Sequence, residues 1–340
     1  MRILVFSAKE FEISYLNKAN HIHFDVEFAN KQLDIETAAL AKGFNCISIF
    51  TNDDCSAAVL NELHLFGVKY IAVRAAGFDN VDIHEAGRLG MHVANVPEYS
   101  PYSIAEHAVG MLLTLVRKIT TANEQVHANN FSLNNLVGFD LHGKRVGLIG
   151  TGRIGSIMAK ILHGFGCEIL AYDIAPSQDL SEKYGVRYCA LNELSLTSDI
   201  ISIHTPLNEQ TRYLLNKSLF ASMKKGVIII NTARGGVVNT SDLITYLRNG
   251  IIAAYGMDVY EKEKGIFFFD HSLKGIADPM LKELLSMKNV LVTPHQAFAT
   301  REALMNIATT TFSTILTWSA GVRPDNELTH EPVLSLMGNK

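Results

Sequence analysis

An α/β fold of two domains is predicted, with one domain interrupting the chain of the other. Short apolar runs alternate with helical patterns in residues 2–97 and again in residues 145–295. Such alternation indicates parallel sheets covered by helices. The expected strands are 3–6, 26–29, 46–50, 70–76 and 92–97 in the first series, and 146–150, 168–173, 200–204, 227–233, 253–259 and 290–295 in the second.

Two long helical patterns flank the second series. Residues 99–128 are expected to form one helix that bridges the domains, with Ser100 or Ser103 as N-cap, Pro101 in the first turn and Glu106 completing a capping box. We infer that a last helix, residues 300–319, packs back on the first series. The domain boundaries are therefore placed at 1–100 with 299–335, and at 101–298.

Composition limits the classes of function. The 340 residues carry a formal charge of −4 and are 48% apolar, which argues against a nucleic-acid partner. No apolar run reaches the roughly 18 residues that span a bilayer, and the start MRILVFSAKE is interpreted as a strand rather than a signal peptide. A cytoplasmic protein without a membrane partner is expected.

Cysteine and histidine patterns predict no metal site. The cysteines Cys46, Cys55, Cys167 and Cys189 form no CxxC pair and are expected to be small buried side chains. No HExxH occurs among the 13 histidines.

The segment GTGRIG, Gly150 to Gly155, follows a predicted strand and opens a predicted helix. Gly150 permits a tight turn, Gly152 lets the backbone approach a pyrophosphate, and Gly155 allows close packing of helix and strand. The amides at the helix start, at Arg153 and Ile154, favour phosphate groups. The segment therefore predicts a dinucleotide site.

Asp173 ends the next strand, 18 residues after Gly155. A carboxylate there accepts hydrogen bonds from the adenosine ribose and repels a 2′-phosphate, so the predicted cofactor is NAD rather than NADP. Other strand ends are expected to contact the same cofactor: His204, Thr205 and Pro206, then Thr232 and Ala233, then Asp258. His204 is equally compatible with a satisfied histidine of the core.

Dehydrogenation of an alcohol requires a base for the hydroxyl proton and a cation that holds the substrate. Arg234 in NTARGG, Glu263 in DVYEKE and His295 in TPHQAF follow successive strands and suit these tasks. Imidazole ionises near neutral pH, and a neighbouring carboxylate favours its protonated form. Arginine binds a 2-oxo acid through two parallel hydrogen bonds.

These motifs resemble the NAD-dependent D-2-hydroxyacid dehydrogenase family over nearly the whole chain. Four segments are similar to its branch of bacterial fermentative D-lactate dehydrogenases: RAAGFDNVD, VPEYSPYSIAEHA, GMDVYEKEKGIFFFD and TPHQAF. The resemblance implies a Rossmann NAD-binding domain inserted into a flavodoxin-like substrate domain. It also implies a homo-oligomer, a dimer or tetramer, built through the cofactor domain.

The resemblance further implies residue roles. His295 is the acid/base, Glu263 orients it, and Arg234 holds the substrate. The amides of Ala76 and Gly77 bind the substrate carboxylate, and Tyr99 and Phe298 shape the pocket. Pyruvate reduction to D-lactate is the expected reaction.

Several alternatives stay open. Glu261 competes with Glu263, since both follow the strand that ends near Asp258, and Lys264 stands where other branches often have proline. Arg74 is expected to form a structural ion pair. A larger branched or aromatic 2-oxo acid is a rival substrate, and an NAD-sensing corepressor is a rival class of function.

Overall fold

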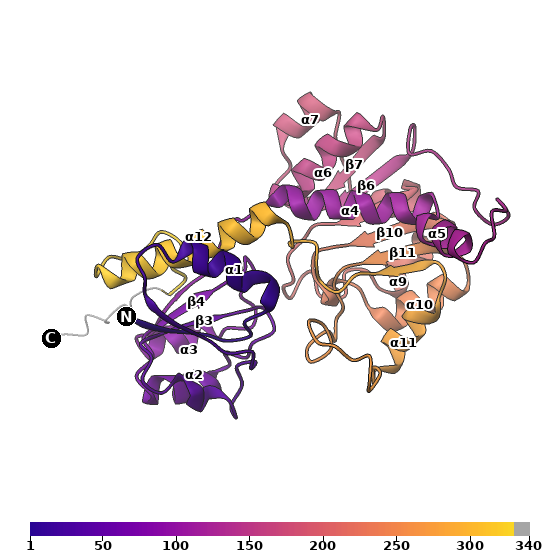
Figure 1. The fold of residues 1–340 in the computed structure, drawn as a ribbon. Helices are drawn as coiled ribbons and strands as arrows, with labels where there is room; N and C mark the ends of the chain where they lie inside the picture. The colour runs from indigo at the N-terminus through magenta and orange to yellow at the C-terminus, as the bar shows by residue number, and fades with distance from the viewer. Residues whose placement is uncertain (330–340) are drawn as a thin grey trace. The chain divides into compact units, whose positions relative to one another are not determined.

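The computed structural model describes residues 1–329, so residues 330–335 of the predicted 299–335 segment lie outside it. The chain divides into two compact units (Figure 1). Among the described residues, unit 1 consists of 1–100 and 299–329, and unit 2 consists of 101–298. Each unit contains one parallel sheet, which confirms the predicted α/β fold class.

Unit 1 contains a five-stranded sheet in the order β2-β1-β3-β4-β5, the flavodoxin-like order. Its central strands consist mainly of apolar residues, nearly all of them buried, as expected for a parallel sheet covered on both faces. The strands are β1 (Arg2–Val5), β2 (Asp25–Phe28), β3 (Cys46–Ile49), β4 (Tyr70–Val73) and β5 (His92–Ala94), and the helices are α1 (Glu10–Ala19), a 3-10 turn (Ala38–Ala41), α2 (Ala57–Leu65), α3 (Ile83–Arg88) and α12 (Arg301–Ser319).

Helix α12 completes the core of unit 1. It begins after Thr300, whose hydroxyl accepts a hydrogen bond from the Ala303 amide. It packs against α1 and β4, and Phe312 and Trp318 belong to the same buried cluster as Leu16 of α1. The last helix therefore packs on the first unit, as inferred from the chain order.

Unit 2 contains a seven-stranded sheet in the order β12-β11-β10-β9-β6-β7-β8. Its first six strands by chain order follow the Rossmann arrangement, with the order reversing between β6 and β9. The strands are β6 (Arg145–Ile149), β7 (Glu168–Tyr172), β8 (Arg187–Tyr188), β9 (Ile200–Ile203), β10 (Val227–Asn231), β11 (Ile252–Met257) and β12 (Val290–Val292). The two-residue β8 is too short to show a sequence pattern and was not predicted.

Helices cover both faces of this sheet. Buried residues of α4 and α6, such as Leu112 and Met158, form one core with the strands, and residues of α8 to α11, such as Phe220 and Leu247, form the other. The helices are α4 (Pro101–Val116), α5 (Ile119–His127), α6 (Arg153–Gly164), α7 (Gln178–Tyr184), α8 (Leu191–Thr197), α9 (Lys217–Ser222), a 3-10 turn (Gly235–Val237), α10 (Thr240–Arg248) and α11 (Pro279–Ser286).

The prediction of one helix over residues 99–128 is wrong. Helix α4 ends at Val116, and Lys118 takes a left-handed conformation (φ 53°) before α5 begins. The backbone of Gly138 packs so closely on this break that an added Cβ would lie 2.1 Å from the Val116 carbonyl oxygen. Because α4 begins at Pro101, Ser103 lies in its first turn and cannot be the N-cap.

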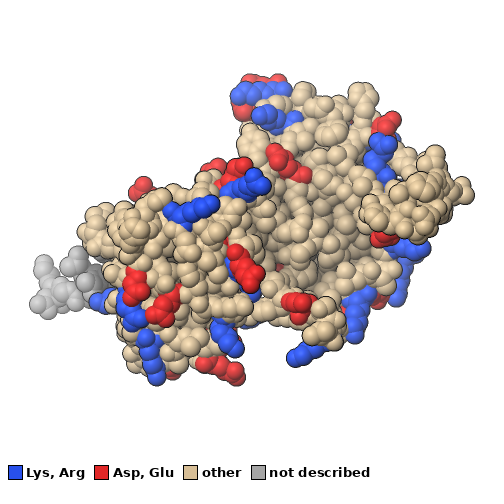
Figure 2. Space-filling model, viewed as in Figure 1, with Lys and Arg blue, Asp and Glu red and all other residues tan. Residues whose placement is uncertain are grey.

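Large apolar side chains are exposed along α5 and the loop that follows it. We call this set the α5 apolar surface: Ile119, Val126, Phe131, Leu133, Val137 and Phe139. In Figure 2 the outer part of this region, at the position of α5 in Figure 1, shows few charged side chains. Elsewhere on that face, side chains of both charges are interspersed.

All four cysteines are free thiols. Cys46 and Cys55 are buried, and burial raises the pKa of both thiols. Cys167 and Cys189 are only partly buried, so the expectation of burial is wrong for these two. None of the helices within residues 1–329 has the length and apolar character needed to cross a membrane.

Candidate active site

The GTGRIG segment forms a tight turn between β6 and α6. Gly150 has a φ of 93°, a conformation that favours glycine, and a Cβ at this position would lie 2.6 Å from the carbonyl oxygen of His204. A Cβ at Gly155 would lie 2.1 Å from the carbonyl oxygen of Gly150. Gly152 is the N-cap of α6, and nothing lies within 4 Å of where its Cβ would be.

The turn therefore has the form that a dinucleotide phosphate requires. Arg153 and Ile154 are the first two residues of α6, at the helix end where backbone amides and the helix dipole favour a bound phosphate. The open space beside Gly152 allows close approach of a ligand to the backbone. These residues fit the phosphates of NAD.

Asp173 follows β7 and is tied to the turn. Its carboxylate accepts hydrogen bonds from the amide of Thr151 (2.6 Å), the hydroxyl of Thr151 (3.0 Å) and the amide of Ala175 (2.8 Å). Partial burial alone would raise the pKa of Asp173, but these hydrogen bonds together hold it below its usual value. Asp173 is therefore a persistent anion beside the glycine turn.

The other predicted cofactor residues lie where β9 and β10 end. His204 is half-buried and its Nε2 lies 2.9 Å from the hydroxyl of Ser202, while burial lowers its pKa to about 4. Thr205 and Pro206 follow it. The hydroxyl of Thr232 is buried without a hydrogen-bond partner among residues 1–329, an arrangement expected where a ligand or water supplies the partner. Ala233 donates its amide to the side chain of Asn231.

Arg234 is half-buried and comes directly after these residues. Its Nη1 donates to the carbonyl of Ala233 at 2.8 Å. The next residue, Gly235, touches the backbone of Tyr260 and Glu261, since an added Cβ would lie 2.1 Å from the Tyr260 carbonyl carbon. Glycine at this position brings the loop of Arg234 against the loop that carries Glu263.

Glu263 and His295 form a hydrogen-bonded pair. The Nδ1 of His295 lies 2.8 Å from Oε1 of Glu263, and Oε2 of Glu263 accepts the amide of Tyr260 at 3.0 Å. Glu261 instead accepts the hydroxyl of Tyr213 at 2.8 Å. The structure therefore separates the two glutamates, and only Glu263 contacts the histidine. Because Nδ1 is used in this bond, Nε2 is the ring nitrogen available for a substrate.

Asp258 has a task that its position in the sequence did not indicate. It is fully buried and accepts the hydroxyl of Thr293 (2.6 Å), the amide of Gln296 (2.8 Å) and the amide of Ala297 (2.8 Å). His295 lies between these donors with a φ of 56°, a conformation that is strained in residues other than glycine. The carboxylate of Asp258 thus holds the residues that precede and follow His295 in the chain.

The remaining predicted site residues divide between the units. Ala76 and Gly77 follow β4 in unit 1, and among residues 1–329 neither amide donates a hydrogen bond. The carbonyl of Tyr99 accepts the side-chain amide of Asn306 at 2.7 Å, also within unit 1. Phe298 is buried at the end of unit 2.

Arg74 forms the structural ion pair expected of it. It is completely buried, and Nε and Nη2 donate to the two oxygens of Glu12 at 3.0 and 3.1 Å. Its other donors bond to the hydroxyl of Ser48 and the carbonyl of Phe6.

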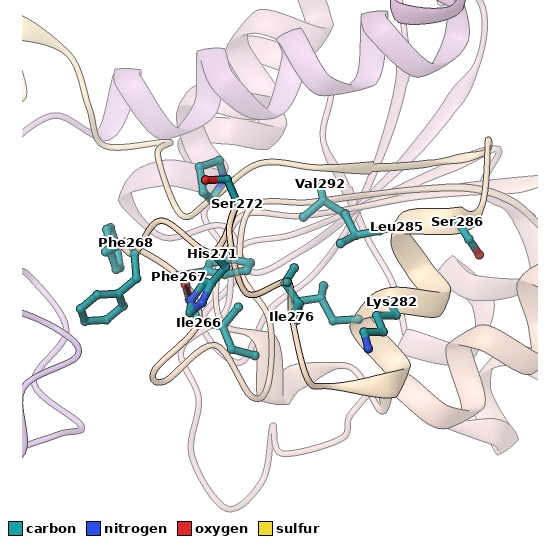
Figure 3. Close-up of a pocket in the computed structure, with 14 residues that line it drawn as sticks. Ile266, Phe267, Phe268, His271, Ser272, Ile276, Lys282, Leu285, Ser286 and Val292 are labelled. Carbon is teal, nitrogen blue, oxygen red and sulfur yellow. Dashed lines mark hydrogen bonds between the residues drawn. The ribbon is translucent and has the colours of Figure 1, made fainter.

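An apolar pocket of about 740 Å³ borders the segment of His295. Its lining comes from the segment after β11, from α11 and from β12 (Figure 3). Pro294 contributes to the lining, and the ring of Phe268 lies 5.6 Å from the imidazole of His295. Within residues 1–329 no cluster of three metal-ligating side chains is present.

Comparison with known proteins identifies the class to which this fold and site belong. Residues 109–297 match the model of the D-isomer specific 2-hydroxyacid dehydrogenase NAD-binding domain. This match covers more than half of the chain, so the protein belongs to the D-2-hydroxyacid dehydrogenase family and is an NAD-dependent oxidoreductase.

Within this family the chain is similar to several D-lactate dehydrogenases. The D-lactate dehydrogenase of Escherichia coli is 45% identical over 96% of this chain and 100% of its own. The pyruvate reductase of Chlamydomonas reinhardtii has a TM-score of 0.89 at 43% identity, covering 95% of this chain and 97% of that one. The D-lactate dehydrogenase of Aquifex aeolicus, complexed with NAD and lactic acid, has a TM-score of 0.85 at 31% identity, covering 94% and 96%.

Proposed function

We propose that this protein is a D-lactate dehydrogenase that reduces pyruvate reversibly with NADH. The observation that carries the proposal is the 2.8 Å contact between Nδ1 of His295 and Glu263, in a chain whose relatives include D-lactate dehydrogenases. Such a reaction regenerates NAD, which suits a fermentative role.

In this proposal His295 is the acid and base. Glu263 accepts a hydrogen bond from Nδ1–H of His295, which orients the ring. Protonated His295 then gives its Nε2 proton to the carbonyl oxygen of pyruvate as that oxygen becomes a hydroxyl. When bound, NADH supplies the hydride to C2. Arg234 and the amides of Ala76 and Gly77 bind the substrate carboxylate. Tyr99 and Phe298 limit the size of the substrate's side chain.

The cofactor contacts follow from the glycine turn and its neighbours. Asp173 selects NAD by its negative charge, and the amides at the start of α6 bind the phosphates. Strand-end residues complete the cofactor contacts: His204, Thr205, Pro206, Thr232 and Ala233. Asp258, which the sequence placed among them, is not one, because its buried carboxylate already accepts from Thr293, Gln296 and Ala297. Residues 101–298 then serve as the NAD-binding domain, and 1–100 with 299–335 as the substrate domain.

The decisive experiment substitutes His295→Gln. Turnover should fall by at least about 100-fold, because general acid catalysis contributes a factor of that order, while NADH binding measured by fluorescence stays near the wild-type value. The hydroxy acid made by the wild-type enzyme should have the D configuration on a chiral column. Near-normal turnover of the variant would disprove the role of His295.

The alternative substrate is a larger 2-oxo acid. Hydrophobic pockets discriminate single methylene groups by only about 10- to 200-fold, so related acids compete. We expect kcat/KM to be highest for pyruvate when pyruvate, 2-oxoisocaproate and phenylpyruvate are compared at equal NADH concentration. A higher value for either larger acid would reassign the substrate.

We also propose a cytoplasmic homo-oligomer. The four free thiols suit a reducing compartment, and the α5 apolar surface suits contact with a second copy of the chain.

A further inference from the structure

A histidine outside the predicted catalytic set lies against the segment that carries His295. His107 is on α4, and its Nε2 is 3.1 Å from the hydroxyl of Thr293 and 3.6 Å from Oδ1 of Asp258. Its side chain is only 19% exposed. Helix α4 begins where the chain enters unit 2, and Thr293 lies shortly before the chain leaves it.

The donors and acceptors in this cluster fix the proton on His107. The hydroxyl of Thr293 lies 2.6 Å from Oδ1 of Asp258. A carboxylate oxygen accepts hydrogen bonds, so the one hydroxyl proton of Thr293 is donated to Asp258. Thr293 can then only accept from His107. His107 must therefore carry a proton on Nε2, in either of its protonation states.

This chain of hydrogen bonds ends at the backbone of the catalytic segment. Asp258 accepts the amides of Gln296 and Ala297 on one side of His295 and the hydroxyl of Thr293 on the other. The amide of His295 donates to the carbonyl of Thr293 at 3.0 Å, which closes a tight turn around its left-handed backbone. A left-handed conformation at a residue other than glycine persists only when its surroundings hold it.

We propose that His107 is a positioning residue for His295. By donating to Thr293, it directs the threonine hydroxyl to Asp258 and so fixes the segment that presents the His295 ring to the substrate. This inference rests on the proposed function, in which His295 is the acid and base.

The experiment compares variants that keep or remove one hydrogen-bonding group. His107→Leu removes the donor, and His107→Gln keeps an N–H donor on a side chain of similar length. Thr293→Val removes the hydroxyl, and Thr293→Ser keeps it. His127→Ala is the matched control, because this exposed histidine on α5 bonds to the Asn123 carbonyl of its own helix and lies outside the cluster of His107.

We expect His107→Leu and Thr293→Val each to lower kcat by about 10- to 100-fold, since a displacement of about 1 Å costs rates of that order. KM for NADH should change by less than about threefold. His107→Gln and Thr293→Ser should recover most of kcat, and the double variant His107→Leu with Thr293→Val should be no slower than the slower single variant. His127→Ala should match the wild type.

Three results would overturn the inference: wild-type kcat in His107→Leu, equal losses in the Leu and Gln variants, or multiplicative losses in the double variant. If His107→Leu does not fold, the comparison of Thr293→Val with Thr293→Ser decides the question. If His295→Gln keeps its turnover, the proposed function fails first, and that outcome is distinct from a neutral His107→Leu.

Discussion

Two glutamates separated by one residue have different partners. Glu263 bonds to Nδ1 of His295, whereas Glu261 bonds to Tyr213. Glu263→Gln should lower kcat by about 100-fold, because an amide can also present a donor group to Nδ1 and therefore orients the imidazole ring less well. Glu261→Gln is the matched control and should stay within about twofold of the wild type. Steady-state kinetics with pyruvate measures both, and a reversed order would give the role to Glu261.

His204 should make stability depend on pH. Burial lowers its pKa to about 4, whereas the unfolded chain has the ordinary value of 6.5. Between pH 6.5 and 4 the unfolded state binds the proton and the folded state does not, so stability falls as the pH is lowered, by at most about 1.4 kcal/mol per pH unit.

Urea denaturation at pH 7 and pH 4.5 measures this loss. We expect His204→Gln to lose less stability than the wild type over the same interval, because glutamine does not titrate. Equal losses in both proteins would show that other groups cause the acid sensitivity.

Much of the candidate site could be predicted from residue identity and spacing. The positions of Arg234, Glu263 and His295 at successive strand ends could be predicted, because parallel strands present their carboxyl ends at one edge of a sheet. The direction in which Asp258 faces could not be predicted, since either a ligand or the protein's own amides could bind it. His107 and Thr293 were missed for the same reason, although Thr293 lies in the TPHQAF motif beside His295.

At the scale of elements, the end of β7 and the glycine turn are joined by Asp173. Its carboxylate bonds to Thr151, so it both orders the turn and carries the charge that faces a ribose in the proposed site. Asp173→Asn keeps the size of the side chain and removes the charge. The ratio of kcat/KM for NADH over NADPH should fall by at least about tenfold, since a carboxylate repels the 2′-phosphate.

The control for this prediction is Asp179→Asn on α7. Asp179 is exposed and pairs with Lys183 in the same helix, so its substitution should leave the ratio unchanged. An unaltered ratio in Asp173→Asn would place cofactor discrimination elsewhere.

The break between α4 and α5 shows what periodicity cannot reveal. Apolar residues recur at helical spacing through residues 99–128, and lysine is a good helix former, so nothing local marks Lys118. The break accompanies a contact from Gly138, twenty positions further along the chain. Tertiary packing of this kind overrides local propensity.

At the scale of the whole molecule, the α5 apolar surface predicts self-association. Phe131 and Leu133 are 73% and 76% exposed, and their burial against a second copy would stabilise an oligomer. The wild type should have at least twice the mass of one chain by light scattering, and the double variant Phe131→Asp with Leu133→Asp should have a smaller mass.

The control is Leu273→Asp, because Leu273 is 98% exposed and lies outside the α5 apolar surface. Its mass should equal that of the wild type. A monomeric wild type, or a double variant of unchanged mass, would contradict the proposed interface.

The position of α12 in unit 1 also determines the order in which the molecule can form during synthesis. The first hundred residues leave the ribosome early, but their core includes Phe312 and Trp318, which are made only after all of unit 2. Unit 2 is continuous in sequence and can fold before the core of unit 1 is complete. Trp318 is the protein's only tryptophan, and its ring lies 5.2 Å from that of Tyr70. Its fluorescence should therefore change when the core of unit 1 forms, and it should not change during the earlier folding of unit 2.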